Sequence, residues 1–247
     1  MEIRRKLLPL TVHILIGFTI TGTTGEDNPE ETGPYFEGDI IFSPIKPFSG
    51  RLDERYRWNN KTVHYKFEPN YPNQLQATFK RAIDHISERT CVKFQPRTEW
   101  DADYIYVISS TSCYSYVGRQ GGVQVISLPN TCNSLGTFIH EIIHALGFYH
   151  EQSRPDRDEH VEILWENIVA GKEVQFRKYD VNQITTYEVN YDYSSIMHYR
   201  STAFSKDSAN LNTIVPINST EPPETIGQRK GMSPGDILKV NRMYNCV

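Results

Sequence analysis

His140, Glu141, His144, Gly147 and His150 follow the spacing H-E-x-x-H-x-x-G-x-x-H. Residues four apart lie one above the other on a helix, so His140 and His144 can direct two imidazole nitrogens at one point. Glu141 lies about 100° further round the helix, where it can reach a water bound at that point. Gly147 can adopt the left-handed conformation that ends a helix, which lets His150 return as a third ligand. Three imidazoles and an open position are typical of a catalytic zinc site.

This chemistry needs one helix with two different faces. The side that faces away from the histidines is apolar, with Ile139, Ile142, Ile143 and Leu146. Asn133 or Ser134 would cap the start of the helix. The five-residue pattern H-E-x-x-H also recurs by chance in ordinary helices. The longer pattern also fixes a glycine and a third histidine, so we predict that His140, His144 and His150 bind one Zn²⁺ per chain.

Patterning predicts the elements around this helix. Strands are expected at Val63–Phe67, Cys91–Gln95, Tyr104–Ile108 and Gly121–Leu128. An amphipathic helix is expected over Asn73–Arg89, and a closing helix over Ser233–Asn245. Residues 159–179 are expected to be partly helical. The first half of the domain is therefore expected to be a sheet with two helices, and the second half mostly irregular.

Two further segments resemble one protein family. Residues 147–158 read GFYHEQSRPDRD and residues 195–199 read SIMHY. The extended histidine motif is that of the metzincins, and its continuation resembles the astacin family of zinc endopeptidases. The resemblance runs from about Trp58 to the C-terminus. It implies an α+β, two-lobed catalytic domain, whose N-terminal lobe is a twisted mixed sheet with two helices and whose C-terminal lobe is mostly irregular with a closing helix.

The resemblance also implies roles for single residues. Glu141 would be the general base that takes a proton from the metal-activated water. Tyr199 would be a fifth zinc ligand that moves off the metal and donates to the developing oxyanion. Met197, in the Met-turn, would form a hydrophobic floor under the histidines. His198 is interpreted as structural, because three histidine ligands are already assigned.

Two charged residues have alternative interpretations. The resemblance places Arg229 in the pocket for the residue after the scissile bond, where it would favour an acidic side chain. Arg229 could instead belong to a solvated basic turn with Lys230. Glu151 would form a buried link to the N-terminus that processing creates, although a glutamate at this place could also be a surface charge.

The N-terminal segments predict a secreted precursor. Residues 1–24 have a basic start and an apolar run, as in a secretory signal peptide; a membrane anchor is the alternative. Residues 25–48 are assigned to a propeptide, called the leader below, and residues 49–247 to the catalytic domain, with processing expected near Ser49. Within the leader, Glu26–Asp39 is expected to be poorly packed. Phe36-Glu37-Gly38-Asp39 resembles the astacin propeptide motif, in which the aspartate occupies the open zinc position; a simple turn is the alternative.

Composition fits an extracellular protein. The chain is 38% hydrophobic and 23% charged, and its net charge of −4 argues against nucleic acid or an anionic membrane as a partner. Four cysteines suit an oxidising compartment and allow three pairings. The resemblance implies the pairs Cys91–Cys246 and Cys113–Cys132. Asn60 and Asn218 begin glycosylation triplets.

We therefore predict a secreted zinc endopeptidase made as a zymogen. Its partners would be protein or peptide substrates and an activating protease, and the chain would be a monomer. A catalytically weak relative that acts as a binding or toxin-like protein is the alternative, although such a protein would usually lose a ligand or Glu141. A zinc amidase acting on non-peptide amides is a third possibility, and the Met-turn argues against it.

Overall fold

The computed structural model describes residues 28–42, 53–217, 220 and 222–246. Its first half is built on a six-stranded sheet in the order β1-β5-β6-β4-β2-β3. The strands are β1 (Ile40–Ile41), β2 (Thr62–Phe67), β3 (Lys93–Pro96), β4 (Tyr104–Ile108), β5 (Tyr114–Tyr116) and β6 (Val123–Ser127). All neighbours are parallel except β5 and β6, which are antiparallel. The expected mixed sheet is therefore confirmed, with two short strands, β1 and β5, that the sequence did not predict.

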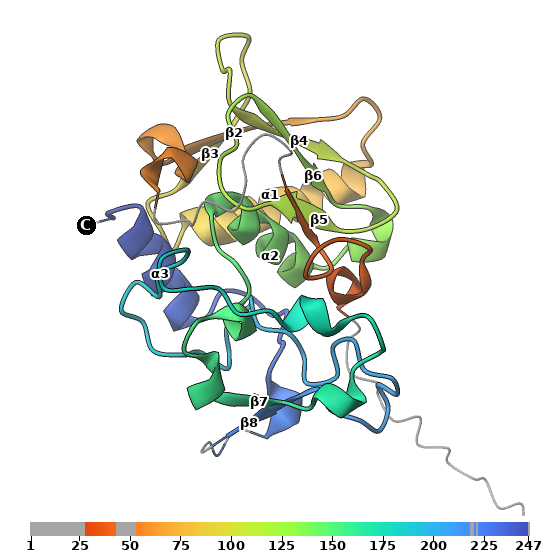
Figure 1. The fold of residues 1–247 in the computed structure, drawn as a ribbon. Helices are drawn as coiled ribbons and strands as arrows, with labels where there is room; N and C mark the ends of the chain where they lie inside the picture. Colours follow the sequence, from red (N-terminus) through yellow and green to blue (C-terminus); the bar gives the residue numbers. More distant parts are fainter. Residues whose placement is uncertain (1–27, 43–52, 218–219, 221, 247) are drawn as a thin grey trace, which may run out of the picture.

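Two helices pack on this sheet, α1 (Asn73–Ser87) and α2 (Leu135–Leu146), as Figure 1 shows. The apolar stripe of α1 is buried, with Leu75, Phe79, Ile83 and Ile86 in one cluster with the sheet residues Val63, Ile105 and Ile126. The apolar face of α2 enters the same cluster through Ile139, Ile142 and Leu146. Apolar side chains recur about every 3.6 residues in the helices and every second residue in the strands, so they face one another and form one continuous core.

In the described residues of the second half, the structure has two short strands and one α-helix. Strands β7 (Val161–Ile163) and β8 (Ile214–Pro216) pair antiparallel, and α3 (Pro234–Met243) closes the domain. A capping box between Ser233 and Asp236 begins α3. The expected two-lobed α+β architecture is confirmed, with little regular structure in this half.

The prediction for residues 159–179 was partly wrong. Val161 and Ile163 are buried and Glu162 is exposed, which is the alternation of a strand and not of a helix. The rest of the region contains two short 3₁₀ turns, an isolated bridge between Ile168 and Ser205, and irregular segments, without an α-helix. The 3₁₀ turns described in the chain are Pro29–Thr32, Glu54–Tyr56, Asn59–Lys61, Asn130–Cys132, Glu151–Ser153, Arg157–Glu159, Trp165–Asn167, Glu173–Phe176 and Pro223–Thr225.

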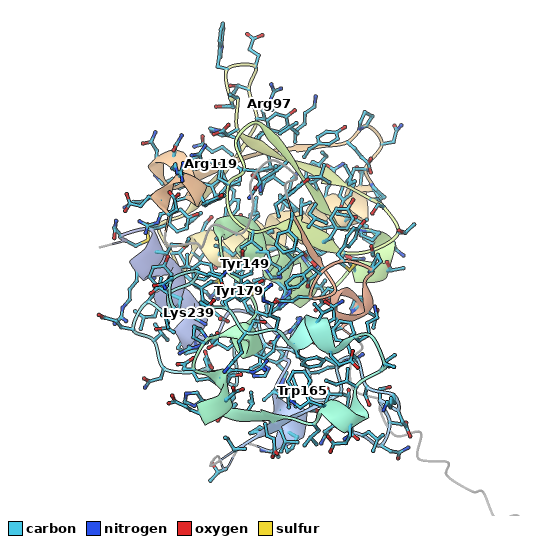
Figure 2. The ribbon with its side chains drawn as sticks, in the orientation of Figure 1. Arg97, Arg119, Tyr149, Trp165, Tyr179 and Lys239 are labelled. Carbon is cyan, nitrogen blue, oxygen red and sulfur yellow. A yellow bond between two sulfur atoms is a disulfide. The ribbon has the colours of Figure 1, made fainter. Side chains whose placement is uncertain are left out.

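The expectation that Glu26–Asp39 is poorly packed is wrong for the described residues 28–39, in which Glu30, Glu31, Glu37 and Asp39 are fully buried. Strand β1 extends the sheet by pairing with β5 (Figure 1). Its Ile40 is buried in a small cluster with Val117, Tyr149, Tyr179 and Ile184. The rings of Tyr149 and Tyr179, labelled in Figure 2, pack with their centroids 4.2 Å apart and their planes tilted by 34°. The leader therefore packs into the domain through apolar side chains as well as through backbone pairing.

Two disulfides join the described cysteines. Cys91 is bonded to Cys246, and Cys113 to Cys132. These are the pairings that the family resemblance implies. In the part of the chain that the structure describes, no helix has the length and apolar character needed to cross a membrane. The predicted signal peptide, residues 1–24, and the expected processing point near Ser49 lie outside the described residues.

Candidate active site

Helix α2 is bounded by the residues that the sequence indicated. The Ser134 side chain accepts a hydrogen bond from the backbone N–H of Thr137, so Ser134 is the N-cap. Gly147 ends the helix with φ +123°. A Cβ there would also lie 2.5 Å from Cε of Met243 in α3. The glycine therefore allows both the turn toward His150 and the close approach of α3.

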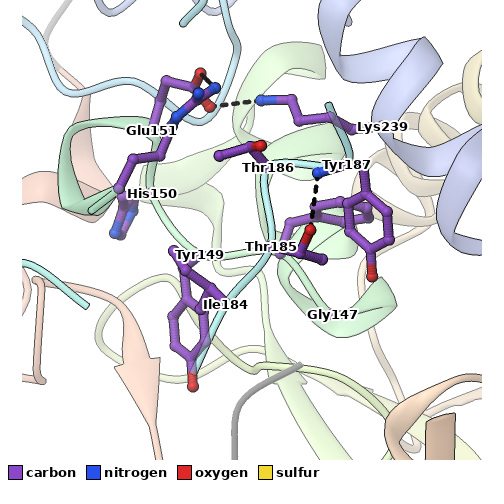
Figure 3. A pocket seen from close by; sticks show the side chains of 11 residues that line it. Gly147, Tyr149, His150, Glu151, Ile184, Thr185, Thr186, Tyr187 and Lys239 are labelled. Carbon is purple, nitrogen blue, oxygen red and sulfur yellow. Dashed lines mark hydrogen bonds and ion pairs between the residues drawn. The ribbon is translucent and has the colours of Figure 1, made fainter. Parts of the chain in front are cut away.

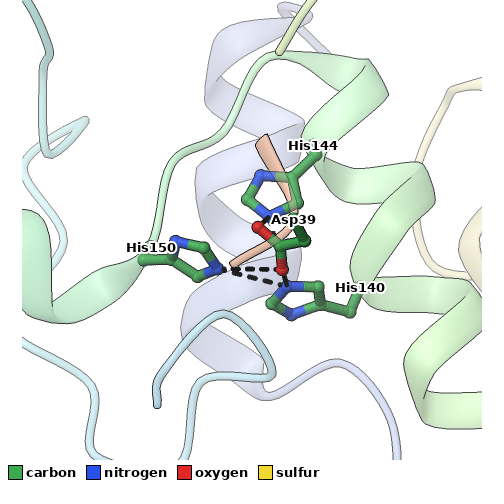
Figure 4. A group of neighbouring side chains, drawn as sticks. All are labelled: Asp39, His140, His144 and His150. Carbon is green, nitrogen blue, oxygen red and sulfur yellow. Dashed lines mark hydrogen bonds and ion pairs between the residues drawn. The ribbon is translucent and has the colours of Figure 1, made fainter. Parts of the chain in front are cut away.

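Three histidines and one aspartate converge at one point, two of the histidines on α2 before this turn and one after it (Figure 4). Their ligand atoms all lie within 4.8 Å of one another, and all four residues are buried. Nε2 of His140 is 3.1 Å from Nε2 of His144 and 3.3 Å from Nε2 of His150. The carboxylate of Asp39 lies among them, with Oδ2 3.0 Å from Nε2 of His140. The helix brings the first two histidines together, and the turn adds the third.

The other nitrogen of each ring is held by an oxygen. Nδ1 of His140 donates to the Ile196 carbonyl at 2.8 Å, and Nδ1 of His144 to the Phe148 carbonyl at 2.7 Å. Nδ1 of His150 lies 2.7 Å from Oε2 of Glu37. These acceptors require a proton on Nδ1, which leaves Nε2 of each ring as the ligand atom.

The donor set fits zinc. Imidazole nitrogens that share one tetrahedral zinc at about 2.0–2.1 Å lie roughly 3.4 Å apart, close to the spacing of these Nε2 atoms. Burial and the nearby Arg229 lower the pKa of His140 to about 4, which keeps that ring neutral. Burial lowers the pKa of His150, but Asp39 and Glu37 outweigh it and raise the pKa to about 9. His150 must therefore lose a proton when it binds a metal.

Glu141 lies next to this group on α2. It is fully buried, and neither carboxylate oxygen has a hydrogen-bond partner within the described residues. Burial raises the pKa of Glu141 well above its usual value, and the carboxylates of Asp39 and Glu30 raise it further. A buried polar group without a partner is uncommon and marks a place where a water or ligand belongs. Asp39 and Glu30 both belong to the leader. The presence of the leader therefore disfavours the ionised form of Glu141.

The predicted Met-turn lies directly under the site. Ile196 accepts from His140, and the Met197 carbonyl accepts from the backbone N–H of Glu151. Met197 is buried in the main core. The Tyr199 ring lies against His150, with centroids 4.7 Å apart, and its hydroxyl donates to the Glu37 carbonyl at 2.7 Å. In this form the tyrosine therefore contacts the leader.

The side chain of His198 does not join the three-histidine group and has other partners. Its Nε2 lies 2.8 Å from the Tyr191 hydroxyl, and its Nδ1 donates to the Tyr199 carbonyl at 2.7 Å. Burial lowers its pKa to about 4. These contacts account for His198 without a metal.

Glu151 is buried and already has cationic partners. Its carboxylate accepts from Arg154 at 2.9 Å and pairs with Lys239 of α3 at 2.5 Å. The sequence did not indicate Lys239, because it lies 88 residues further along the chain. A small pocket borders this pair, lined also by His150, Thr186 and Tyr187 (Figure 3).

Arg229 is buried rather than part of a solvated turn. Its Nε pairs with Oε1 of Glu30 at 2.5 Å, and its Nη2 lies 3.4 Å from Oε1 of Glu31. The alternative of an exposed basic turn is therefore wrong. These two glutamates could not be predicted as partners of Arg229, because ion pairs between residues far apart in the chain leave no local pattern in the sequence. Asn60 is exposed, whereas Asn218 lies outside the described residues.

Comparisons with known proteins agree with this geometry. The peptidase family model named "Astacin" matches residues 51–245. Zinc metalloproteinase nas-13 of Caenorhabditis elegans is 44% identical over 220 residues, which cover 89% of this chain and 48% of nas-13. Zinc metalloproteinase nas-4 of the same organism is 38% identical, covering 91% of this chain and 73% of nas-4. This chain thus spans about half the length of nas-13.

A solved structure is also similar. High choriolytic enzyme 1, a hatching enzyme zinc-protease from Oryzias latipes, shares 41% identity with a TM-score of 0.71. The match covers 77% of this chain and 94% of that one. The three-histidine group, the mixed sheet over α2 and the family match across residues 51–245 together show that this chain belongs to the astacin family of zinc metallopeptidases.

Proposed function

We propose that this chain is the latent precursor of a secreted zinc endopeptidase. The observation that carries the proposal is the carboxylate of Asp39, which lies among the Nε2 atoms of the three histidines. A carboxylate oxygen is a good zinc ligand, and at this place it excludes a catalytic water. The leader therefore blocks the position where hydrolysis must begin.

In the proposed mechanism, each residue of the site has a separate role. His140, His144 and His150 would hold the zinc, which when bound polarises a peptide carbonyl and acidifies a water. Glu141 is the general base: once Asp39 has left, it accepts a proton from the attacking water and passes it to the leaving nitrogen. Tyr199, freed from the Glu37 carbonyl, donates its hydroxyl to the oxygen that becomes negative in the transition state.

The leader is proposed to leave after cleavage by another protease near Ser49. Residues 1–24 direct secretion and residues 25–48 are the propeptide. The pocket beside Glu151 (Figure 3) is proposed to receive the new N-terminus, in a region where Lys239 already pairs with that glutamate. Met197 serves as a hydrophobic support for the site. Arg229 is proposed to favour an acidic residue after the scissile bond, since a buried guanidinium binds carboxylates strongly.

A casein assay tests the proposed function directly. The processed chain should cleave denatured casein, and a chelator should abolish cleavage until zinc is restored. Glu141→Gln keeps the size of the side chain but removes the base, so activity should fall at least about a hundredfold while bound zinc, measured by metal analysis, stays at one per chain. Casein cleavage that persists with chelator, or in the glutamine variant, would contradict the proposal.

A further inference from the structure

Two adjacent glutamates of the leader are completely buried. Glu30 and Glu31 both have 0% exposure in the turn Pro29–Thr32. A buried carboxylate is costly unless it is paired and hydrogen-bonded. Two of them side by side therefore need a surface built to receive negative charge, and two arginines of the catalytic domain provide it.

Glu30 reaches the helix that carries the catalytic residues. Its Oε1 pairs with Nε of Arg229 at 2.5 Å, and its Oε2 accepts from Oγ1 of Thr137 at 3.3 Å. Thr137 lies four residues before Glu141, so both occupy one face of α2. A Cβ at Gly136 would lie 1.7 Å from the Arg229 carbonyl oxygen, so the backbone of Arg229 lies directly on α2. Glu30 thus sits on the same helix face as the general base.

Glu31 binds a second arginine. Its Oε2 pairs with Nε of Arg200 at 3.1 Å, and its Oε1 accepts from the backbone N–H of Arg200 at 2.9 Å. Asn28 donates to the same Oε1 at 2.8 Å. A Cβ at Gly227 would lie 2.3 Å from Cα of Arg200, so the segment before Arg229 packs directly on Arg200. The two arginines therefore belong to one surface.

The position of Arg200 connects this surface to the reaction. Arg200 directly follows Tyr199, whose hydroxyl contacts the leader at Glu37. Arg229 lies against α2, the helix that carries His140, because a Cβ at Gly136 would lie 1.7 Å from the Arg229 carbonyl oxygen. Its Nη1 donates to the carbonyls of His198 and Gln228, which fixes the guanidinium in place. An arginine that is already oriented loses little freedom when it binds a carboxylate.

We propose that Arg200 and Arg229 form one recognition site for two neighbouring carboxylates, which Glu30 and Glu31 fill in the precursor and acidic segments of substrates fill after the leader leaves. Arg200 is the new specificity-determining residue. This inference rests on the proposed function and extends it from one acidic position to a pair. In this proposal the leader imitates a substrate at the two arginines, while its Asp39 takes the open ligand position of the metal.

The first test uses the intact chain and needs no catalysis. Hydrogen exchange of the leader amides 28–42 is measured in four chains: the parent, Glu31→Gln, Arg200→Ala and the double variant, all carrying Glu141→Gln so that no self-cleavage occurs. Each single change should speed exchange about tenfold or more, because it leaves one partner of a buried ion pair without the other. The double variant should be little faster than either single one, because both remove the same contact. Fully additive effects would overturn the pairing. Arg89→Ala, an exposed arginine at the end of α1, is the matched control.

The second test separates substrate recognition from latency alone. The leader is removed by cleavage before Ser49, and a fluorescent peptide of residues 28–42 is bound to the remaining chain. Unrelated peptides with Glu-Glu, Gln-Gln or Lys-Glu pairs then compete for it. Glu-Glu should compete at least about tenfold better than Gln-Gln, and Arg200→Glu should shift the preference toward Lys-Glu. Equal competition by all peptides, or an unchanged ranking in Arg200→Glu, would overturn the proposal. Because binding is measured, a chain that binds acidic pairs but cleaves no casein would refute the proposed function alone.

Discussion

At the scale of single residues, the proposed function makes the carboxylate of Asp39 the difference between the latent and the active form. The pKa of Asp39 lies well below its usual range: burial opposes ionisation, but His150 and His144 outweigh it. The carboxylate is therefore charged where it lies, which suits a ligand of a cation. In the proposed mechanism, the substrate carbonyl and the attacking water must share this same position.

The Asp39→Ala change should therefore produce a precursor with measurable activity. The alanine leaves room for a water at the metal, while β1 and the glutamate contacts still hold the leader. Turnover of a short peptide by the uncleaved chain should rise clearly above that of the parent, and self-processing should accelerate. Asp207→Ala, which removes an exposed carboxylate in a turn, should change neither. If the Asp39 variant is as silent as its parent, the leader blocks by covering the cleft, and Asp39 is only a turn residue.

At the scale of elements, local sequence patterns predicted single helices and strands but not the contacts between residues far apart in the chain. The zinc helix could be predicted because its spacing, its cap at Ser134 and its end at Gly147 are all encoded within a few residues. The ion pair between Glu31 and Arg200 spans 169 residues and leaves no local signal. Strand β1 is only two residues long and exists because β5 accepts it. Such features depend on which segments meet, which periodicity does not reveal.

The turn after α2 can be tested through its glycine. Gly147→Ala places a Cβ at φ +123° and against Met243, so the backbone must shift and His150 with it. We expect a loss of stability of about 1–3 kcal/mol together with weaker zinc binding. Gly171→Ala is the matched control, because Gly171 also has a positive φ (+84°) but its Cβ would meet nothing within 4 Å. The control should lose some stability and keep the zinc affinity of the parent. Unchanged zinc affinity in Gly147→Ala would show that the glycine does not position His150.

At the scale of the whole molecule, helix α3 contacts two segments that carry the site. Asp236 of α3 accepts from the Ser195 hydroxyl at 2.6 Å and from the Ile196 backbone N–H at 2.9 Å. Lys239 of the same helix pairs with Glu151, which directly follows a zinc ligand. The Met-turn and the third histidine are thus both connected to α3. The disulfide Cys91–Cys246 in turn ties the end of the chain beyond α3 to the first half of the domain.

Removing that disulfide should therefore affect both stability and the metal. Cys91 and Cys246 are 155 residues apart, so in the chain-entropy model their bond contributes roughly 5 kcal/mol. Cys113 and Cys132 are 19 residues apart, and their bond contributes about 3 kcal/mol. Paired serine variants, unfolded by denaturant with and without zinc, should show the larger loss for Cys91→Ser/Cys246→Ser. Only that variant should also bind zinc more weakly, because α3 is the element it releases. Equal zinc affinity in the two paired variants would mean that the contacts of Asp236 and Lys239 hold the site without the covalent link.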